Sequence, residues 1–438
     1  MLGSPRWARV IVAAEPAVVL AISPALLFPT PSRILVLIAL PILWMGAWVA
    51  TGRAVPATPL NAAIVLMLIM VAVSLYATID LQFSLGKVAG AILGVAVYWA
   101  ATRWLTTPAR LRVAVGCFVL AGAALAVIGL LGTNFELLDL NAPAKLSIIA
   151  RLAKHLPAVI RGVPGAADGF NPNAVAGVLV LFVPLQVGLL AVRAHEQWVG
   201  PARRPAAHVI EIVLLTITSA TLLLMQSRGA WLGLLIAALA ILSALNWRRA
   251  AAIGSIAAAI VLVSGRIPAL QSMVNPPEFD WTNTVDQRLD LWSSGLRAIR
   301  DFPFTGMGMN VFRRVMPVQY RAAVNDGGGD ISHAHNQLIQ VALDLGIPGL
   351  VAYVALWLLT AALIVKVYRQ SPDRIYRVTA AGLGCGLIAH FVFGITDAIP
   401  IGAKVGIFFW IALALVVGLQ HVAFAASGRP EGRPLHSS

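Results

Sequence analysis

Long apolar segments follow one another along almost the whole chain, and no segment between them is large enough for a separate soluble domain. A helix needs ~20 apolar residues to cross the ~30 Å hydrocarbon core of a bilayer. Charged residues make up only 11% of the 438 residues, against ~25% in soluble domains. The sequence therefore predicts an all-α polytopic membrane protein in which residues 1–438 form a single transmembrane domain.

About twelve segments have the length and composition of membrane spans. They are residues 9–28, 34–50, 59–77, 86–104, 112–132, 173–192, 208–226, 230–246, 251–264, 346–367, 378–396 and 403–424. The formal net charge of +14 is spread mostly over alternate short loops between these spans. Lys and Arg accumulate in cytoplasmic loops, which predicts that both termini are cytoplasmic. Charge spread in this way favours contact with membrane lipids and does not indicate nucleic-acid binding.

Two long connections fall on the outer side in this topology, at residues 133–172 and 265–345. The first has the pattern of an amphipathic segment that lies in the headgroup plane, and a surface anchor is its favoured interpretation. Its basic residues are Lys145, Arg151, Lys154 and Arg161. The second contains a helical stretch at 286–302, followed by the turn-rich TGMGMN at 305–310. We expect this second connection to be a large outer catalytic loop.

His335 lies where the second connection enters an apolar helix, in the stretch SHAHNQL. An imidazole titrates near ~6.5 and can accept a proton from a hydroxyl group at neutral pH. His335 is therefore the candidate catalytic base, with Asn336 beside it, although a helix-capping or hydrogen-bonded histidine fits equally well. His333 is two residues away and would point elsewhere on a helix. No third ligand follows at a spacing typical of metal sites, so we predict no metal.

Two arginines are candidates for binding an anionic substrate. Arg228 lies in QSRGAWLG, a very short outer turn in which Gly229 would allow a tight reversal. An arginine at the membrane surface needs an anionic partner, and guanidinium matches phosphate oxygens in a bidentate manner. Lipid headgroups are the alternative partner. Arg288 precedes Trp292 by four positions and shares a helix face with it, which suits a sugar phosphate or a solvated surface pair.

His390 and Asp397 are seven residues apart in AHFVFGITDAIP, near the outer end of a span. This spacing places them on one face of a helix. Ionisable residues in such a position are paired or line a cavity, and structural pairing is the simpler account. The chain has no Walker loop, dinucleotide fingerprint or pair of catalytic carboxylates. The sequence therefore predicts no cofactor.

From His335 the sequence reads HN, nine residues, Gly346, two residues and Gly349. Four other motifs accompany this one, namely SRGAWLG at Arg228, R-x-x-x-W at Arg288 and Trp292, PFTGMGMNVF and FNPNAVAG. In their order along the chain, over roughly residues 170–400, the motifs resemble the O-antigen ligase and O-antigen polymerase superfamily. Lipopolysaccharide O-antigen ligases are the members favoured here.

The resemblance implies an inverting, metal-independent glycosyltransferase of the GT-C type in the bacterial inner membrane, with its active site on the periplasmic side. Such an enzyme moves a glycan from undecaprenyl diphosphate to a hydroxyl group of lipid A-core. The catalytic histidine of the family would correspond to His335, and its two phosphate-binding arginines to Arg228 and Arg288. The alternative is a polymerase of O-antigen or exopolysaccharide that uses the same donor. A transporter should show midplane charges and broken helices in matched halves, whereas the middle of most spans here is uncharged and the sequence has no internal repeat. A flippase-like or purely structural membrane protein would not need the residues around His335.

Overall fold

The computed structural model describes residues 5–30, 32–133, 135, 169–199, 205–264, 281–320 and 332–425. These residues form helices and no β-strand, which confirms the all-α membrane fold. The first outer connection, 133–172, falls almost entirely outside the described residues. The helices are α1 (Arg6–Leu27), η1 (Arg33–Ile38), α2 (Ala39–Thr51), α3 (Asn61–Ala77), α4 (Leu81–Trp104), α5 (Pro108–Gly132), α8 (Pro172–Leu179), α9 (Val183–Val199), α10 (Pro205–Leu224), α11 (Arg228–Ser264), α13 (Trp281–Asp301), α14 (Phe312–Gln319), α15 (Gln337–Gln370), α16 (Arg374–Thr396), η2 (Lys404–Gly406) and α17 (Ile407–Ala425).

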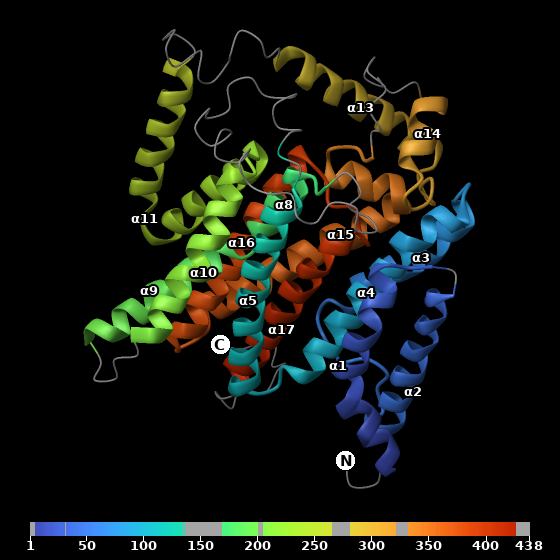
Figure 1. Ribbon diagram of the computed structural model, residues 1–438, viewed down its shortest axis with the longest axis horizontal. Coiled ribbons are helices and arrows are strands. Elements are labelled where there is room, and N and C mark those ends of the chain that lie inside the picture. Colours follow the sequence, from blue (N-terminus) through green and yellow to red (C-terminus); the bar gives the residue numbers. More distant parts are fainter. Residues whose placement is uncertain are drawn as a thin grey trace, which may run out of the picture.

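Among the described residues, ten helical segments are long and apolar enough to cross a membrane, and the apolar α3 is shorter, at 17 residues. The count is below the expected twelve partly because the spans predicted at 230–246 and 251–264 form one helix, α11. Figure 1 shows that α11 bends sharply and continues. Its stretch NWRRAAAIGS contains no proline, and Arg and Ala are strong helix formers, so two charges do not end the helix.

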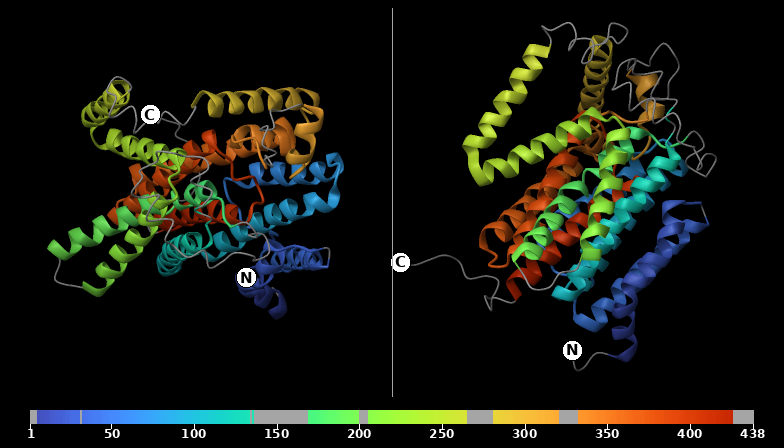
Figure 2. Two further views of the ribbon diagram at one scale, coloured as in Figure 1. Left: turned by 45° about the horizontal axis from the view of Figure 1, so that its top comes forward. Right: turned by 60° about the vertical axis from the view of Figure 1, so that its left-hand side comes forward.

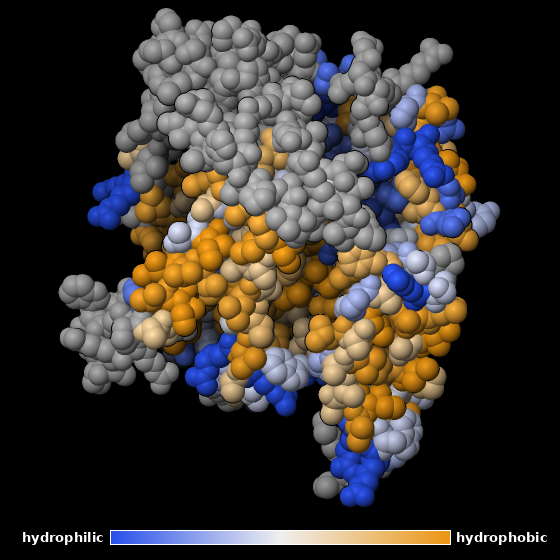
Figure 3. Space-filling view, viewed as in Figure 1, coloured by the Kyte–Doolittle hydropathy of each residue, from blue (hydrophilic) through white to orange (hydrophobic). Residues whose placement is uncertain are grey.

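The helices form a bundle with α16 and α17 at its centre. α16 packs against α9, α11 and α15, and α17 packs against α4 and α5, while α1 and α2 pair at the edge. Figures 1 and 2 show α13 and α14 at one end of this bundle, which we call the α13 end. The start of α1 and the end of α17 lie towards the opposite end. Apolar residues cover the middle of the bundle in Figure 3, and polar residues gather towards its ends.

α15 is interrupted at Gly346, whose φ of 69° and ψ of 178° are non-helical. Such a conformation is essentially open only to glycine. In an unbroken helix the carbonyl of Leu343 would accept the N–H of Ile347. Here Leu343 O accepts the N–H of Met307 at 2.7 Å, and the N–H of Ile347 is donated to Pro303 O at 2.7 Å. The segment 303–307 therefore satisfies the backbone groups that the break frees.

α13 confirms the helix predicted at 286–302 and begins earlier, at Trp281. Its buried residues Leu291 and Ala298 recur at helical spacing on one face. They join a small apolar cluster with Phe312, Ala334 and Leu343, separate from the core of the bundle. Burial in this cluster attaches the residues of the α13 end to the first turns of α15. The cluster thus fixes where the His-bearing segment lies.

Candidate active site

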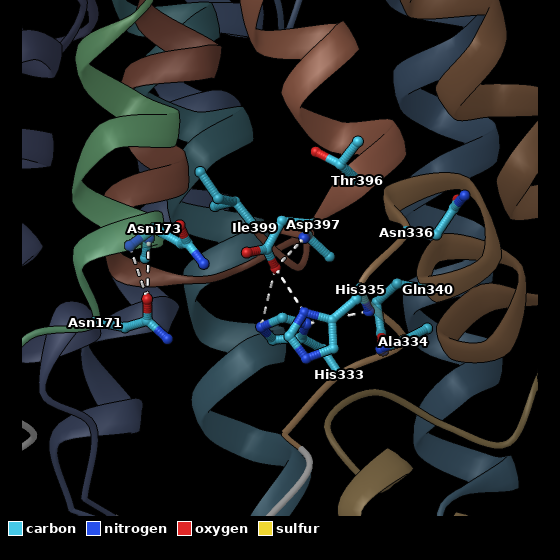
Figure 4. A network of polar contacts seen from close by, with 12 residues as sticks. Asn171, Asn173, His333, Ala334, His335, Asn336, Gln340, Thr396, Asp397 and Ile399 are labelled. Atoms are coloured by element: carbon cyan, nitrogen blue, oxygen red, sulfur yellow. Dashed lines mark hydrogen bonds and ion pairs between the residues drawn. The ribbon is translucent and has the colours of Figure 1, made fainter. Parts of the chain in front are cut away.

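Asp397 brings two imidazoles together at the α13 end. Its Oδ1 atom lies 3.1 Å from Nδ1 of His335 and 3.6 Å from Nε2 of His333. The two rings are 4.5 Å apart between centroids, at an interplanar angle of 62°. Figure 4 shows both rings beside the carboxylate, which stands just beyond the end of α16. Residues 62 positions apart along the chain therefore form one polar cluster.

The expectation that His333 points away from His335 is wrong. That expectation assumed a helix, but α15 begins only at Gln337, and His335 has a φ of +46°. This left-handed conformation is uncommon outside glycine and is a feature of strained functional sites. It turns the chain between His333 and His335 so that side chains two positions apart meet at one carboxylate.

Hydrogen bonds and charge set the protonation of the cluster. The backbone N–H of His335 is donated to Nδ1 of His333 at 3.3 Å, so the proton of the neutral His333 ring is on Nε2. Burial lowers the pKa of His333 to about 4. Burial also raises the pKa of the Asp397 carboxyl, but the hydrogen bond from His335 and the two imidazoles outweigh it, and the net pKa lies below its usual range. At neutral pH the cluster holds an ionised Asp397 and a neutral His333.

His335 is arranged as a base. An ionised carboxylate can only accept hydrogen bonds, so Nδ1 of His335 donates to Asp397 across the 3.1 Å contact. In the neutral ring the lone pair is then on Nε2, which can take a proton from an acceptor hydroxyl. The carboxylate stabilises the imidazolium that results. His335 is thus hydrogen-bonded, as one interpretation of the sequence required, and the same hydrogen bond leaves Nε2 of its neutral ring able to accept a proton.

The same three residues are a group whose ligand atoms converge, within 4.8 Å of one another. Asp397 supplies the third group that the spacing of the histidines did not indicate. Nε2 of His333 faces Asp397 and would have to lose its proton to bind a metal. The hydrogen bond to Nδ1 of His333 keeps that proton in place. The arrangement favours a hydrogen-bonded triad over a metal site.

Trp292 and Asn336 hold the segment that carries His335. The indole N–H of Trp292 is donated to Ala334 O at 3.0 Å, so this side chain contacts the histidine segment directly. Asn336 caps α15, because its Oδ1 accepts the N–H groups of Leu338 and Ile339 at 3.0 and 3.1 Å. Its Nδ2 also donates to Ile395 O at 3.3 Å, near the end of α16.

The two candidate arginines lie on different helices, α11 and α13. Arg228 begins α11 after a reversal in which Gln226 has a φ of 53°, so the predicted turning role of Gly229 is wrong. Gly229 instead packs against Thr396, leaving no room for a side chain between them. Arg228 therefore directly precedes the glycine that contacts Thr396, and Thr396 directly precedes Asp397.

Arg288 lies on α13, one helical turn before Trp292. Both guanidinium groups are partly buried, and their positive charges interact with each other. The structure therefore brings together Arg228 and Arg288, which are 60 positions apart in the sequence. Two cations whose charges interact at the α13 end can bind a diphosphate through several charged hydrogen bonds.

His390 and Asp397 do not pair, which contradicts the simpler account of the sequence. His390 is inside α16, and its Nδ1 lies 2.6 Å from Gly177 O on α8. Asp397 is the C-cap of α16, with an extended backbone at φ −151° and ψ −176°. The extended residue leaves the helical face that His390 occupies. Asn171 caps α8, because its Oδ1 accepts the N–H of Asn173 at 2.8 Å.

Sequence reasoning did not identify Gln340 and Asp344, although both belong to the surroundings of the site. Asp344 is 2% exposed, and its Oδ1 accepts a hydrogen bond from Nε2 of Gln340 at 2.9 Å. Lys87 on α4 is close enough to interact with the charge of Asp344. Single charged residues within apolar segments were the signal that could have revealed Asp344 and Lys87.

Comparison with known proteins identifies part of this chain. Residues 213–354 match the family described as O-antigen ligase. The matched segment contains Arg228, Arg288 and His335, while Asp397 lies beyond it. No protein of curated function matches the chain.

Proposed function

With an O-antigen ligase domain at residues 213–354, the chain is a member of the O-antigen ligase superfamily, and from this premise we propose that it transfers a lipid-linked glycan. The donor is an undecaprenyl-diphosphate-linked O-antigen, and the acceptor is a hydroxyl group of lipid A-core. The observation that carries the proposal is the contact between His335 and Asp397 at the α13 end. A base of this kind is what transfer to a hydroxyl group requires.

The reaction forms one C–O bond and breaks another. Nε2 of His335 takes the proton of the acceptor hydroxyl as its oxygen attacks the anomeric carbon of the donor. The bond from that carbon to the diphosphate breaks, and undecaprenyl diphosphate leaves with the electron pair. Attack from the side opposite the leaving group inverts the anomeric centre. Asp397 stabilises the imidazolium, and no metal is needed for any step.

Arg228 and Arg288 offset the charge that develops on the leaving diphosphate. Fixed cations in a partly buried site stabilise such charge because they need not reorganise during the reaction. Their mutual interaction and partial burial support this role, since two close guanidinium groups are more stable with an anion between them. Their loss should raise the KM for the donor as well as lower kcat.

The proposed location is the bacterial inner membrane, with the α13 end on the periplasmic side and both termini in the cytoplasm. Basic residues support this orientation. Arg103, Arg110, Arg369, Arg374 and Arg377 lie at the ends of α4, α5, α15 and α16 that are remote from the α13 end. Such residues accumulate on the cytoplasmic side.

A transfer assay with two acceptors tests the proposal. Purified protein would receive undecaprenyl-diphosphate glycan and either lipid A-core or a second glycan lipid, in buffer with a metal chelator. We expect product on lipid A-core that disappears in His335→Ala and Arg228→Ala. Product only on the second glycan lipid would make the protein a polymerase. Absence of both products from the wild type would contradict the proposed function.

A further inference from the structure

The first turns of α15 carry two buried glutamines, each of which binds a different segment of the site. Oε1 of Gln337 accepts the N–H of Ile399 at 2.8 Å. Oε1 of Gln340 accepts the N–H of Ala334 at 2.8 Å. The two side chains are 7% and 2% exposed. Buried amides of this kind are costly unless their hydrogen bonds are made.

These two contacts reach the two halves of the catalytic pair. Ala334 directly precedes His335, and Ile399 is two residues after Asp397. Gln337 and Gln340 are three residues apart on one rigid helical turn. The helix therefore sets the distance between the segment that bears the imidazole and the segment that bears the carboxylate.

The Gln340 amide is fixed at both ends. Its Nε2 donates to Oδ1 of Asp344 at 2.9 Å, while its Oε1 holds Ala334. The carbonyl of Ala334 accepts the indole N–H of Trp292. Both backbone groups of Ala334 are thus bound by side chains, which explains how a segment that is neither helix nor strand keeps His335 in a left-handed conformation.

We propose that Gln337 and Gln340 are positioning residues that hold His335 and Asp397 at the distance needed for proton transfer. This inference rests on the proposed function. The two glutamines act through different chemistry, which makes the inference testable. Gln337 uses its carbonyl oxygen as an acceptor, which a glutamate also offers. Gln340 must accept and donate at once, and a glutamate there would place a second carboxylate against Asp344.

The test compares Gln337→Met, Gln337→Glu, Gln340→Met and Gln340→Glu with the wild type. The matched control is Gln186→Met, because Gln186 is also a buried glutamine, 4% exposed, and bonds to Thr218 between α9 and α10. Transfer assays would give kcat and the KM for the donor, and melting curves would give stability. Hydrogen–deuterium exchange would follow the peptides that contain Ala334 and Ile399.

We expect kcat to fall at least ~10-fold in both Met variants with little change in donor KM, since small misplacements of catalytic groups cost up to ~100-fold. Gln337→Glu should recover most of kcat, and Gln340→Glu should not. Gln186→Met should lower the melting temperature and leave kcat unchanged. Hydrogen–deuterium exchange should rise in the peptide that contains Ala334 only in the Gln340 variants. It should rise in the peptide that contains Ile399 only in Gln337→Met.

Unchanged kcat in both Met variants would overturn the inference, and so would a loss of kcat in Gln186→Met that matches theirs. Failure of Gln337→Glu to recover activity would also contradict it. A wild type without transfer activity would instead refute the proposed function. In that case the exchange at Ala334 and Ile399 still decides whether the two glutamines hold these segments.

Discussion

Asp397 shares one carboxylate oxygen between two histidines that differ in what they do. In the proposed reaction His335 presents Nε2 to an acceptor hydroxyl, whereas His333 is more deeply buried, its side chain 14% exposed against 33% for His335. Burial favours the neutral form of an imidazole. The neighbouring neutral ring adds no second positive charge beside His335. A charged His333 there would oppose the imidazolium that the proposed reaction forms on His335.

The pKa of His333 predicts how stability changes with pH. Its value of about 4 in the folded protein lies below 6.5, the ordinary value. Between these values the unfolded chain binds more protons, so stability falls as the pH falls from ~6.5 to ~4. The lowered pKa of Asp397 acts only below its ordinary 3.8, outside this window. The melting temperature of the purified His333→Gln variant should therefore fall less on acidification than that of the wild type. Parallel curves for the two proteins would contradict this account.

Trp292 offers a second prediction, because its proposed roles differ in their kinetics. The indole N–H is donated to Ala334 O. Trp292→Phe should keep an aromatic ring at this position but lose the hydrogen bond that holds the His335 segment. We expect kcat to fall severalfold while the donor KM stays near the wild-type value. Arg288→Ala should raise the donor KM. If Trp292→Phe raises the KM as Arg288→Ala does, Trp292 binds the sugar phosphate instead.

Residue types in the sequence predicted the candidate groups, but not all of their contacts. His335 and Arg228 were recognisable because each stands beside an apolar span with a motif of its own, and Arg288 was recognisable because Trp292 follows it at helical spacing. The pairing of Asp397 with His335 depends on two residues outside regular helix, an extended C-cap and a left-handed histidine. Periodicity assumes regular helix at both positions, and for that reason it paired Asp397 with His390.

At the scale of elements, the break in α15 decides where the site lies. The helix up to Leu345 carries Gln337 and Gln340, and the span proper follows Gly346. The segment 303–307 fills the break with two backbone hydrogen bonds. The sequence predicted turns at 305–310 and a span from 346. The sequence did not indicate that these two segments are joined by hydrogen bonds, because backbone hydrogen bonds leave no pattern of side chains.

Gly346→Ala tests the importance of this break. A Cβ at Gly346 would lie 2.6 Å from backbone atoms of Phe304, and the φ of +69° is unfavourable for alanine. We expect a loss of at least ~2 kcal/mol and a clear fall in melting temperature. Gly116→Ala is the control, because nothing lies within 4 Å of a Cβ in the middle of α5. It should be neutral or slightly stabilising. Equal effects of the two changes would show that the break needs no glycine.

At the scale of the molecule, the site is assembled from four separate segments at one end of the bundle. These segments are the start of α11 with Arg228, α13 with Arg288, the residues before α15 with His335, and the end of α16 with Asp397. Length and hydropathy predicted the membrane fold reliably, since they depend on the bilayer rather than on tertiary contacts. The spans predicted at 230–246 and 251–264 are wrong as separate helices, because a helix such as α11 can continue past charged residues.

The proposed orientation predicts a pattern of chemical labelling. In a background without Cys117 and Cys385, Asp290→Cys on α13 should react with a membrane-impermeant thiol reagent in spheroplasts. Thr106→Cys, in the turn between α4 and α5, should react only after detergent is added. Both positions are exposed, so access to the reagent depends on the side of the membrane. The reverse pattern would place the α13 end in the cytoplasm.

The most direct test of the central claim is a double-mutant cycle on His335 and Asp397. The rate of transfer to lipid A-core would be measured for the wild type, His335→Ala, Asp397→Asn and the double variant. We predict that each single change lowers kcat by ~100-fold or more. The double variant should be no slower than His335→Ala alone, since the two residues act as one unit. Losses that multiply in the double variant, or normal transfer by His335→Ala, would contradict the account.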